Sequence, residues 1–227
     1  MNLAQNLARV REEITRAARQ AGRRPQSVRL VAVSKTKPAQ MVIQALAAGQ
    51  TLFGENYVQE ASQKIPQVTG EATWHFIGHL QSNKAKTAVR LFDVIQTVDR
   101  LKLARALDRH AREQGKTLGV LLQVNLAREP QKSGCSEEEA PALAQAVAQM
   151  PGLKLMGLMT MPPFFDDPER ARPYFAGLRR LAQRLQADLP PGAMDELSMG
   201  MSGDFAAAIA EGATLVRVGT AIFGARG

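Results

Sequence analysis

The sequence predicts a single α/β domain in which eight parallel strands close into a barrel, with an extra helix at the N-terminus. Short apolar runs alternate with amphipathic helical patterns along the 227 residues. Such alternation implies parallel strands joined by right-handed helical crossovers, and eight such units close into a (β/α)8 barrel, the TIM-barrel architecture. The length and a hydrophobic content of 45% suffice for a complete core without a break in composition. We therefore expect one domain spanning residues 1–227.

The first twenty residues predict a folded helix. Apolar residues recur there at spacings of three and four, which makes one apolar stripe: Leu3, Leu7, Val10, Ile14 and Ala17. The segment is rich in arginine, as targeting peptides are, but Glu12 and Glu13 lie among the arginines. No short hydrophobic segment with a cleavage site follows, so we expect no targeting peptide.

The repeating units of strand and helix follow this helix in order. Strands are expected at residues 28–33, 51–54, 73–77, 94–97, 119–125, 154–159, 196–198 and 214–218. Helices are expected between them, at residues 39–48, 57–65, 82–90, 100–114, 137–150, 168–189 and 205–212. A doubly wound open sheet is the alternative. It is disfavoured because no G-x-G-x-x-G or Walker-type phosphate loop follows any of these strands.

The formal charge of +8 raises the question of a nucleic-acid interface. The cations are scattered and lie mostly on expected helices beside carboxylates, as in Arg109 with Glu113 and Glu169 with Arg172. Only 5% of the residues are aromatic, and no basic stripe is interleaved with aromatics. The pattern argues against a nucleic-acid partner, although the charge would attract small phosphorylated anions.

Cysteine use and hydropathy indicate a cytoplasmic protein. The single cysteine, Cys135, excludes an internal disulfide, and no apolar run approaches the eighteen or so residues that cross a membrane. Cys135 lies in a loop where it could be an exposed thiol, but no neighbouring base supports a catalytic role. The histidines His75, His79 and His110 show no metal-ligand spacing with it, so we expect no metal site.

A lysine at the end of the first strand is the leading site candidate. Alternation puts Val31, Val33 and Lys35 on one face of this strand, so Lys35 continues an apolar face at its carboxyl end. Desolvation disfavours an ammonium ion, so an amine there can be neutral and can attack a carbonyl to form a Schiff base. The alternative is a structural lysine that extends to solvent.

The last two strands are followed by segments that suit a phosphate, at residues 199–204 and 219–224. Small residues let backbone N–H groups approach an anion, and Ser202 and Thr220 add hydroxyl donors. A phosphate site after the seventh and eighth strands recurs in barrels of this kind. The alternative is that Ser202 and Asp204 are only helix caps and that the glycines are only turns.

An arginine on the last strand faces the same way as its apolar neighbours. Alternation puts Leu215, Arg217 and Gly219 on one face, toward the barrel interior. A guanidinium there is costly unless something accepts its hydrogen bonds. A ligand atom such as a ring nitrogen, or a buried carboxylate such as that of Glu55, could be the acceptor.

Six motifs in order carry a family resemblance: residues 31–36 (VAVSKT), 53–60 (FGENYVQE), 74–84 (WHFIGHLQSNK), 157–161 (GLMTM), 198–204 (SMGMSGD) and 217–224 (RVGTAIFG). With them, nearly the whole chain resembles the pyridoxal 5′-phosphate (PLP) homeostasis proteins, single-domain relatives of the N-terminal barrel of alanine racemase. The resemblance implies that PLP is the cofactor and that Lys35 holds it as an internal aldimine. It implies that the phosphate is held by Ser202, Gly219 and Thr220. Arg217 would face the pyridine nitrogen, and the pocket around the ring would be lined by Asn56, His79 and Met199.

The resemblance further implies binding and delivery of PLP to PLP-dependent apo-enzymes without catalysis. We also expect a monomer. A charged guanidinium cannot give the ring nitrogen a full proton, so the ring is a weaker electron sink than beside a carboxylic acid. Alanine racemase takes a second base, a tyrosine, from a separate β-domain, and we expect no such domain here. The alternatives are a PLP-dependent amino-acid racemase or lyase, and a barrel aldolase that uses Lys35 on a sugar phosphate.

Overall fold

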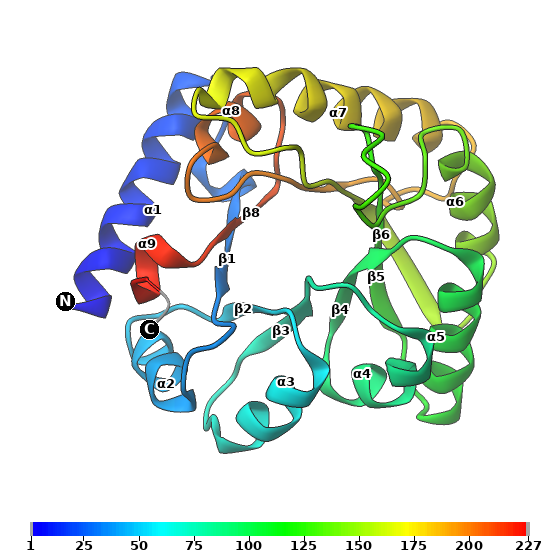
Figure 1. Cartoon of the computed structure of the whole chain (residues 1–227), viewed down its shortest axis with the longest axis horizontal. Helices are drawn as coiled ribbons and strands as arrows, with labels where there is room; N and C mark the ends of the chain where they lie inside the picture. The colour runs from blue at the N-terminus through cyan, green and yellow to red at the C-terminus, as the bar shows by residue number, and fades with distance from the viewer. Residues whose placement is uncertain (1, 226–227) are drawn as a thin grey trace.

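The eight strands form a closed parallel barrel in chain order, as predicted. The computed structural model describes residues 2–225, and its strands are β1 Arg29–Val33, β2 Leu52–Glu55, β3 Thr73–Phe76, β4 Val94–Val98, β5 Leu118–Gln123, β6 Leu153–Met159, β7 Glu196–Ser198 and β8 Leu215–Val218. Pairing of β1 with β8, which aligns Val31 with Arg217, closes the barrel and excludes the open doubly wound sheet. The helices surround the strands (Figure 1).

The α-helices are α1 Leu3–Gln20, α2 Ala39–Ala47, α3 Val58–Lys64, α4 Ala85–Leu91, α5 Leu101–Glu113, α6 Ala140–Ala148, α7 Arg172–Gln186, α8 Phe205–Ala210 and α9 Thr220–Phe223. The helix expected over residues 168–189 is divided into a 3₁₀ turn at Pro168–Ala171 and α7. Pro173 lies in the first turn of α7, where its missing N–H costs nothing, so the α-helix begins there. The short α9 was not among the predicted helices.

The N-terminal helix α1 packs on the end of the chain. Its apolar stripe is buried over the full length, including Leu7 and Val10 at 1% exposure. The side chain of Asn2 accepts a hydrogen bond from the backbone N–H of Ala4 and caps the helix. Asn6 donates to the carbonyl oxygen of Ile222 at 3.0 Å, and α1 lies beside α8 and α9 (Figure 1). The predicted helix is confirmed, and it fixes the segment after β8.

The interior of the barrel has an apolar part and a polar part. The apolar part is a cluster of Val31, Leu121, Met159 and Leu215, whereas Leu30 and Ala32 belong to the outer core beneath the helices. The predicted alternation along β1 and β8 is thereby confirmed. Buried polar side chains make the other part, among them His75, Gln96, Ser198 and Arg217, which a row of hydrogen bonds joins.

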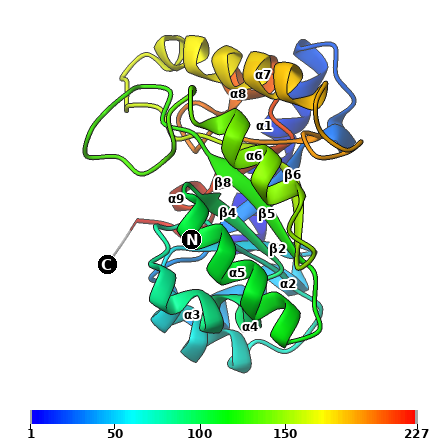
Figure 2. The ribbon, with the colours of Figure 1, turned by 90° about the vertical axis from the view of Figure 1, so that its right-hand side faces the viewer.

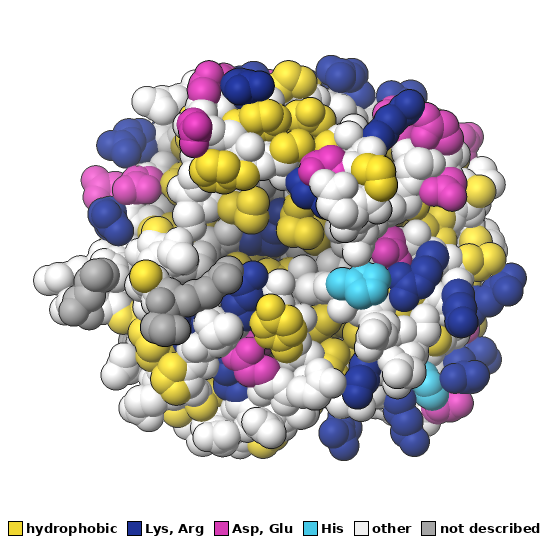
Figure 3. Space-filling view, in the orientation of Figure 1, with side chains coloured by type: hydrophobic (Ala, Val, Ile, Leu, Met, Phe, Trp, Pro, Cys, Tyr) yellow, Lys and Arg dark blue, Asp and Glu magenta, His cyan; other side chains and the backbone are white. Residues whose placement is uncertain are grey.

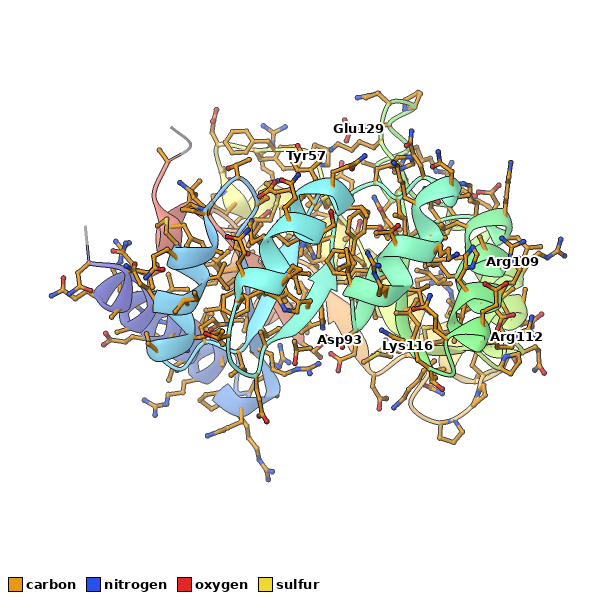
Figure 4. All side chains as sticks on the ribbon, turned by 90° about the horizontal axis from the view of Figure 1, so that it is seen from below. Tyr57, Asp93, Arg109, Arg112, Lys116 and Glu129 are labelled. Atoms are coloured by element: carbon orange, nitrogen blue, oxygen red, sulfur yellow. The ribbon has the colours of Figure 1, made fainter. Side chains whose placement is uncertain are left out.

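The two ends of the barrel carry different loops. Tyr57, which follows β2, and Glu129, which follows β5, lie at one end, and Asp93 and Lys116, which precede β4 and β5, lie at the other (Figure 4). The long loops after β5 and β6 project from the first of these ends, where the strands reach their carboxyl termini (Figure 2). No helix within residues 2–225 is long and apolar enough to span a membrane.

The surface charges pair as expected. Arg109 Nε lies 3.7 Å from Glu113 Oε1, and Arg172 Nε lies 2.6 Å from Glu169 Oε2. Exposed pairs of this kind contribute little to stability, so they mainly explain how a basic chain keeps a mixed surface.

The expectation of an exposed thiol at Cys135 is wrong. Cys135 is 4% exposed, because its backbone bridges to Val124 and carries the side chain into the outer core. Burial raises the pKa of this thiol to about 12, so it stays protonated and unreactive. Over the described residues, no group of three or more His, Cys, Asp or Glu side chains could hold a metal ion.

Candidate functional site

A cavity of about 190 Å³ opens at the carboxyl ends of the strands. Six of the eight predicted site residues line it: Lys35, Asn56, Ser202, Arg217, Gly219 and Thr220. They come from the loops after β1, β2 and β7 and from β8 and the segment that follows it. Figure 3 shows this face hollowed near its centre, with basic side chains inside the hollow and hydrophobic side chains around it. Closure of the barrel therefore brings together residues that are up to 185 positions apart in the chain, such as Lys35 and Thr220.

Lys35 is half-buried in a tight turn between β1 and α2. The N–H of Ser34 donates to the carbonyl oxygen of Gly54 at 3.0 Å, and the N–H of Lys37 donates to that of Ser34 at 3.1 Å. Thr36 has a φ of 62°, a left-handed conformation that a β-branched residue rarely adopts. Lys37 also lines the cavity, and its Nζ donates to the carbonyl oxygen of Ala225 at 2.6 Å.

Arg217 lies in the wall of the cavity and is 3% exposed. Its Nη1 donates to the hydroxyl of Ser198 at 2.7 Å, and its Nη2 donates to the carbonyl oxygen of Thr160 at 2.9 Å. Burial lowers the pKa of the guanidinium to about 10, and Asp204 opposes this shift, so the group is charged at neutral pH. The cavity therefore has a fixed positive charge in its wall.

The sequence left open a pairing of Arg217 with Glu55, and the structure shows that this alternative is wrong. Alternation along β2 places Glu55 on the outward face of the strand, between β2 and α3. There it accepts hydrogen bonds from Lys64 Nζ at 2.8 Å and from the hydroxyl of Ser34 at 2.6 Å. Within residues 2–225, Arg217 forms no ion pair with a carboxylate within 4.0 Å. The hydroxyl of Ser198 and the carbonyl oxygen of Thr160, which accept from its guanidinium, are both neutral, so the charge of Arg217 is available to a ligand.

Asn56 is held by the close approach of the loop after β3. A Cβ at position 78 would lie 2.1 Å from the carbonyl oxygen of Asn56, so only glycine fits there. The Oδ1 atom of Asn56 is buried and has no hydrogen-bond partner in the described part of the chain. A buried acceptor without a donor is costly, which makes this atom a candidate ligand contact.

The segments after β7 and β8 present Ser202, Gly219 and Thr220. Ser202 and Thr220 are exposed and Gly219 is half-buried. The carbonyl oxygen of Gly219 accepts from the N–H groups of Ile222 and Phe223, both at 2.9 Å, and so starts α9. Asp204 stands at the cap position of α8, but its side chain accepts from the N–H of Met201 instead of capping that helix. Ser202, Gly219 and Thr220 thus line the cavity from the segments that follow two neighbouring strands.

His79 and Met199 are not among the residues that line the cavity. His79 is exposed, and its Nδ1 lies 2.9 Å from the hydroxyl of Ser133, on the loop after β5. Met199 is fully buried in the outer core beneath the helices. A role for these two residues at the ligand stays a prediction.

Several residues that line the cavity were not predicted as site residues from the sequence: Val33, Thr36, Lys37, Ile77, Met161, Met201, Phe223 and Gly224. Val33 shares the inward face of β1 with Lys35, so alternation was a usable signal. Met161 and Met201, which are 37% and 38% exposed, lie inside quoted motifs, but nothing in their type or spacing distinguishes a lining methionine from a core one.

The family model described as "Alanine racemase, N-terminal domain" matches residues 5–227. Among curated proteins, the chain is 48% identical to the pyridoxal phosphate homeostasis protein of Pseudomonas aeruginosa, over 99% of this chain and 96% of the relative. It is 45% identical to the protein of that name in Escherichia coli, over 99% and 97%. The solved structure of PipY from Synechococcus elongatus with PLP bound has a TM-score of 0.88 and 41% identity, covering 98% of this chain and all of the other.

Proposed function

We propose that this chain, which belongs to the pyridoxal phosphate homeostasis protein family, binds PLP in the cavity at the carboxyl ends of the strands. The barrel of this family is the alanine racemase N-terminal domain. We further propose that the protein supplies PLP to apo-enzymes without catalysing a reaction itself. The observation that carries this proposal is that one cavity joins Lys35, a buried charged Arg217 and two hydroxyl side chains. A relative 41% identical to this chain has been solved with PLP bound.

The chemistry of the lining residues fits PLP, which supplies an aldehyde, a pyridine ring and a phosphate. The amine of Lys35 suits the aldehyde and holds the cofactor as a Schiff base. Ser202 and Thr220 suit the phosphate as hydroxyl donors, with the backbone of Gly219 between their strands. Arg217 suits the ring nitrogen, and the unpartnered Oδ1 of Asn56 suits a donor on the ligand or on water bound with it.

Arg217 also supports the absence of catalysis. Its pKa of about 10 keeps it a cation, so it donates a hydrogen bond to a ring nitrogen but does not transfer its proton. A ring without that proton withdraws electrons less strongly, which disfavours carbanion chemistry at a bound amino acid. The residue next to the cofactor thus suits storage better than turnover.

Titration of the purified protein with PLP tests the binding. We expect a visible absorption band, and a stability increase of about 2.7 kcal/mol at a hundredfold excess over Kd, because PLP binds only the native state. The loaded protein should restore activity to apo-forms of PLP enzymes. A protein that gives neither band nor thermal shift with PLP does not have this function.

Absence of turnover is tested with a panel of L- and D-amino acids in deuterated water. The loaded protein should leave α-proton exchange and configuration at the level of free PLP. Deuterium incorporation at the α-carbon of one amino acid, lost in Lys35→Ala, would identify a racemase or lyase instead. Size-exclusion chromatography of the same samples checks the expected monomer.

A further inference from the structure

A buried cluster of charges lies directly behind the Lys35 turn, outside the barrel wall. The Nζ of Lys64, on α3, donates to Glu60 Oε1 at 2.6 Å, to Glu55 Oε1 at 2.8 Å and to the carbonyl oxygen of Ser34 at 2.7 Å. Lys64 is 5% exposed and Glu55 is fully buried. Glu55 and Glu60 belong to the motif of residues 53–60, but neither lines the cavity.

This cluster holds the backbone on both sides of Lys35. Before it, the carbonyl oxygen of Ser34 accepts from Lys64, and the hydroxyl of Ser34 donates to Glu55 at 2.6 Å. After it, the N–H of Thr36 donates to Glu60 Oε1 at 2.6 Å. Lys35 is therefore the one residue between two backbone groups that the same cluster binds.

Thr36 is the point at which this support matters most. Its φ of 62° is left-handed, a conformation that is strained for a β-branched residue because its Cβ approaches the following carbonyl oxygen too closely. Such a conformation persists only where surrounding contacts impose it. The carboxylate of Glu60 accepts from the N–H of Thr36 itself, and Lys64 holds that carboxylate in place. Without Glu60, the turn that carries Lys35 would relax toward other conformations.

We propose that Glu60 is a positioning residue: held by Lys64, it fixes the strained Thr36 turn and so directs the amine of Lys35 at the aldehyde carbon of PLP. The inference rests on the proposed function, and it assigns a role to a residue that does not touch the ligand. In the step affected, Lys35 Nζ forms a C=N bond with the aldehyde carbon, and the aldehyde oxygen leaves as water with two protons from the amine. A displaced turn lowers the rate of that step because the reacting atoms are less often aligned.

Two substitutions of Glu60 separate its role as a hydrogen-bond acceptor from its negative charge. Glu60 is 26% exposed, so either variant should fold. Glu60→Ala removes the acceptor, and we expect the visible band with PLP to form about tenfold more slowly. Glu60→Gln keeps an oxygen at the same position to accept from Thr36, and we expect a rate close to that of the unsubstituted protein.

Binding of pyridoxine 5′-phosphate is the second measurement, because this compound has the ring and phosphate of PLP but no aldehyde. Its affinity should change far less than the PLP rate in Glu60→Ala, because its binding does not need the amine of Lys35 to reach an aldehyde carbon. Equal losses in its affinity and in the PLP rate would mean that Glu60 supports the whole cavity, which would overturn the inference.

Asp108→Ala is the matched control. Asp108, on α5, also accepts from a backbone N–H, that of Gly152 at 2.8 Å, and from a cation, Arg112 Nε at 3.1 Å. Neither Asp108 nor its partners line the cavity. The control should lose stability without a change in the PLP rate. If Glu60→Gln is as slow as Glu60→Ala, or if the control slows equally, Glu60 does not position Lys35. A protein that forms no band at all before substitution contradicts the proposed function instead.

Discussion

The guanidinium of Arg217 donates to the hydroxyl of Ser198 across 2.7 Å, and this contact sets the direction of a buried hydrogen-bond chain. Arginine can only donate, so the Ser198 proton is free to point at Gln96 Oε1, 2.6 Å away. The amide nitrogen of Gln96 then lies 2.6 Å from His75 Nδ1. The ring of His75 must therefore accept at Nδ1 and carry its proton on Nε2. This chain of hydrogen bonds crosses the barrel interior from β8 to β3 through side chains of β7 and β4.

The first prediction concerns Lys35. Lys35→Ala should abolish the visible band with PLP and the covalent adduct trapped by borohydride, because both need the amine at the end of β1. Absorbance and intact-protein mass spectrometry measure the two effects. An unchanged adduct in this variant would assign the Schiff base to another lysine. Lys37 is the first alternative because it lines the same cavity, and Lys84 is the second.

The second prediction concerns the phosphate. The double variant Ser202→Ala, Thr220→Ala should weaken the binding of PLP far more than that of pyridoxal, which has no phosphate. Both side chains are exposed, so their loss should leave the fold intact. Fluorescence titration with each ligand makes the comparison. Equal losses for the two ligands would contradict the phosphate assignment.

The third prediction concerns Ser198. Ser198→Ala leaves a buried guanidinium nitrogen and the buried Gln96 oxygen without this partner, so the free energy of unfolding should fall by about 1–3 kcal/mol. Urea unfolding without ligand measures it. The control is Ser27→Ala, which removes an exposed hydroxyl that donates to the carbonyl oxygen of Arg24 and should change stability by less than about 0.5 kcal/mol. Equal effects of the two substitutions would mean that the buried chain contributes nothing specific.

The fourth prediction concerns His75 and pH. Burial, with a smaller effect of Arg29, lowers the pKa of His75 to about 3 in the folded protein, against about 6.5 in an unfolded chain. Between these values only the unfolded state binds the proton, so His75 makes stability fall as pH falls from about 6.5 toward 3. Between these two pH values, His75 changes the free energy of unfolding by about 1.4 kcal/mol per pH unit. Above pH 6.5 His75 no longer contributes to the pH dependence of stability.

His75→Gln tests this pH dependence, because glutamine can accept from Gln96 but does not titrate. Urea unfolding of both proteins at pH 7, 6 and 5 should show a steeper loss of stability in the protein that keeps the histidine. Parallel curves would show that His75 is not held neutral in the folded state.

The sequence by itself determined the fold and the end of the barrel at which the site lies. Alternation of strand and helix predicted parallel strands, and parallel strands in a closed barrel place all their carboxyl ends together. Lys35, Ser202, Arg217 and Thr220 could be predicted to line a cavity there because each is at or just beyond the end of a strand. The period of two along β1 and β8 correctly predicted which of their residues point inward.

Only the tertiary structure decided which side chains meet. Arg217 bonds to Ser198 and Thr160 instead of Glu55, because Glu55 falls on the outward face of β2, where Lys64 of α3 reaches it. Cys135 is buried because its loop bridges back to Val124, directly after β5, which local sequence does not reveal. Such contacts join residues that are 9 to 57 positions apart in the chain, so they depend on strand register, on helix placement and on side-chain rotamers. Local pattern fixes the face on which a residue lies, whereas packing of the whole chain selects its partner there.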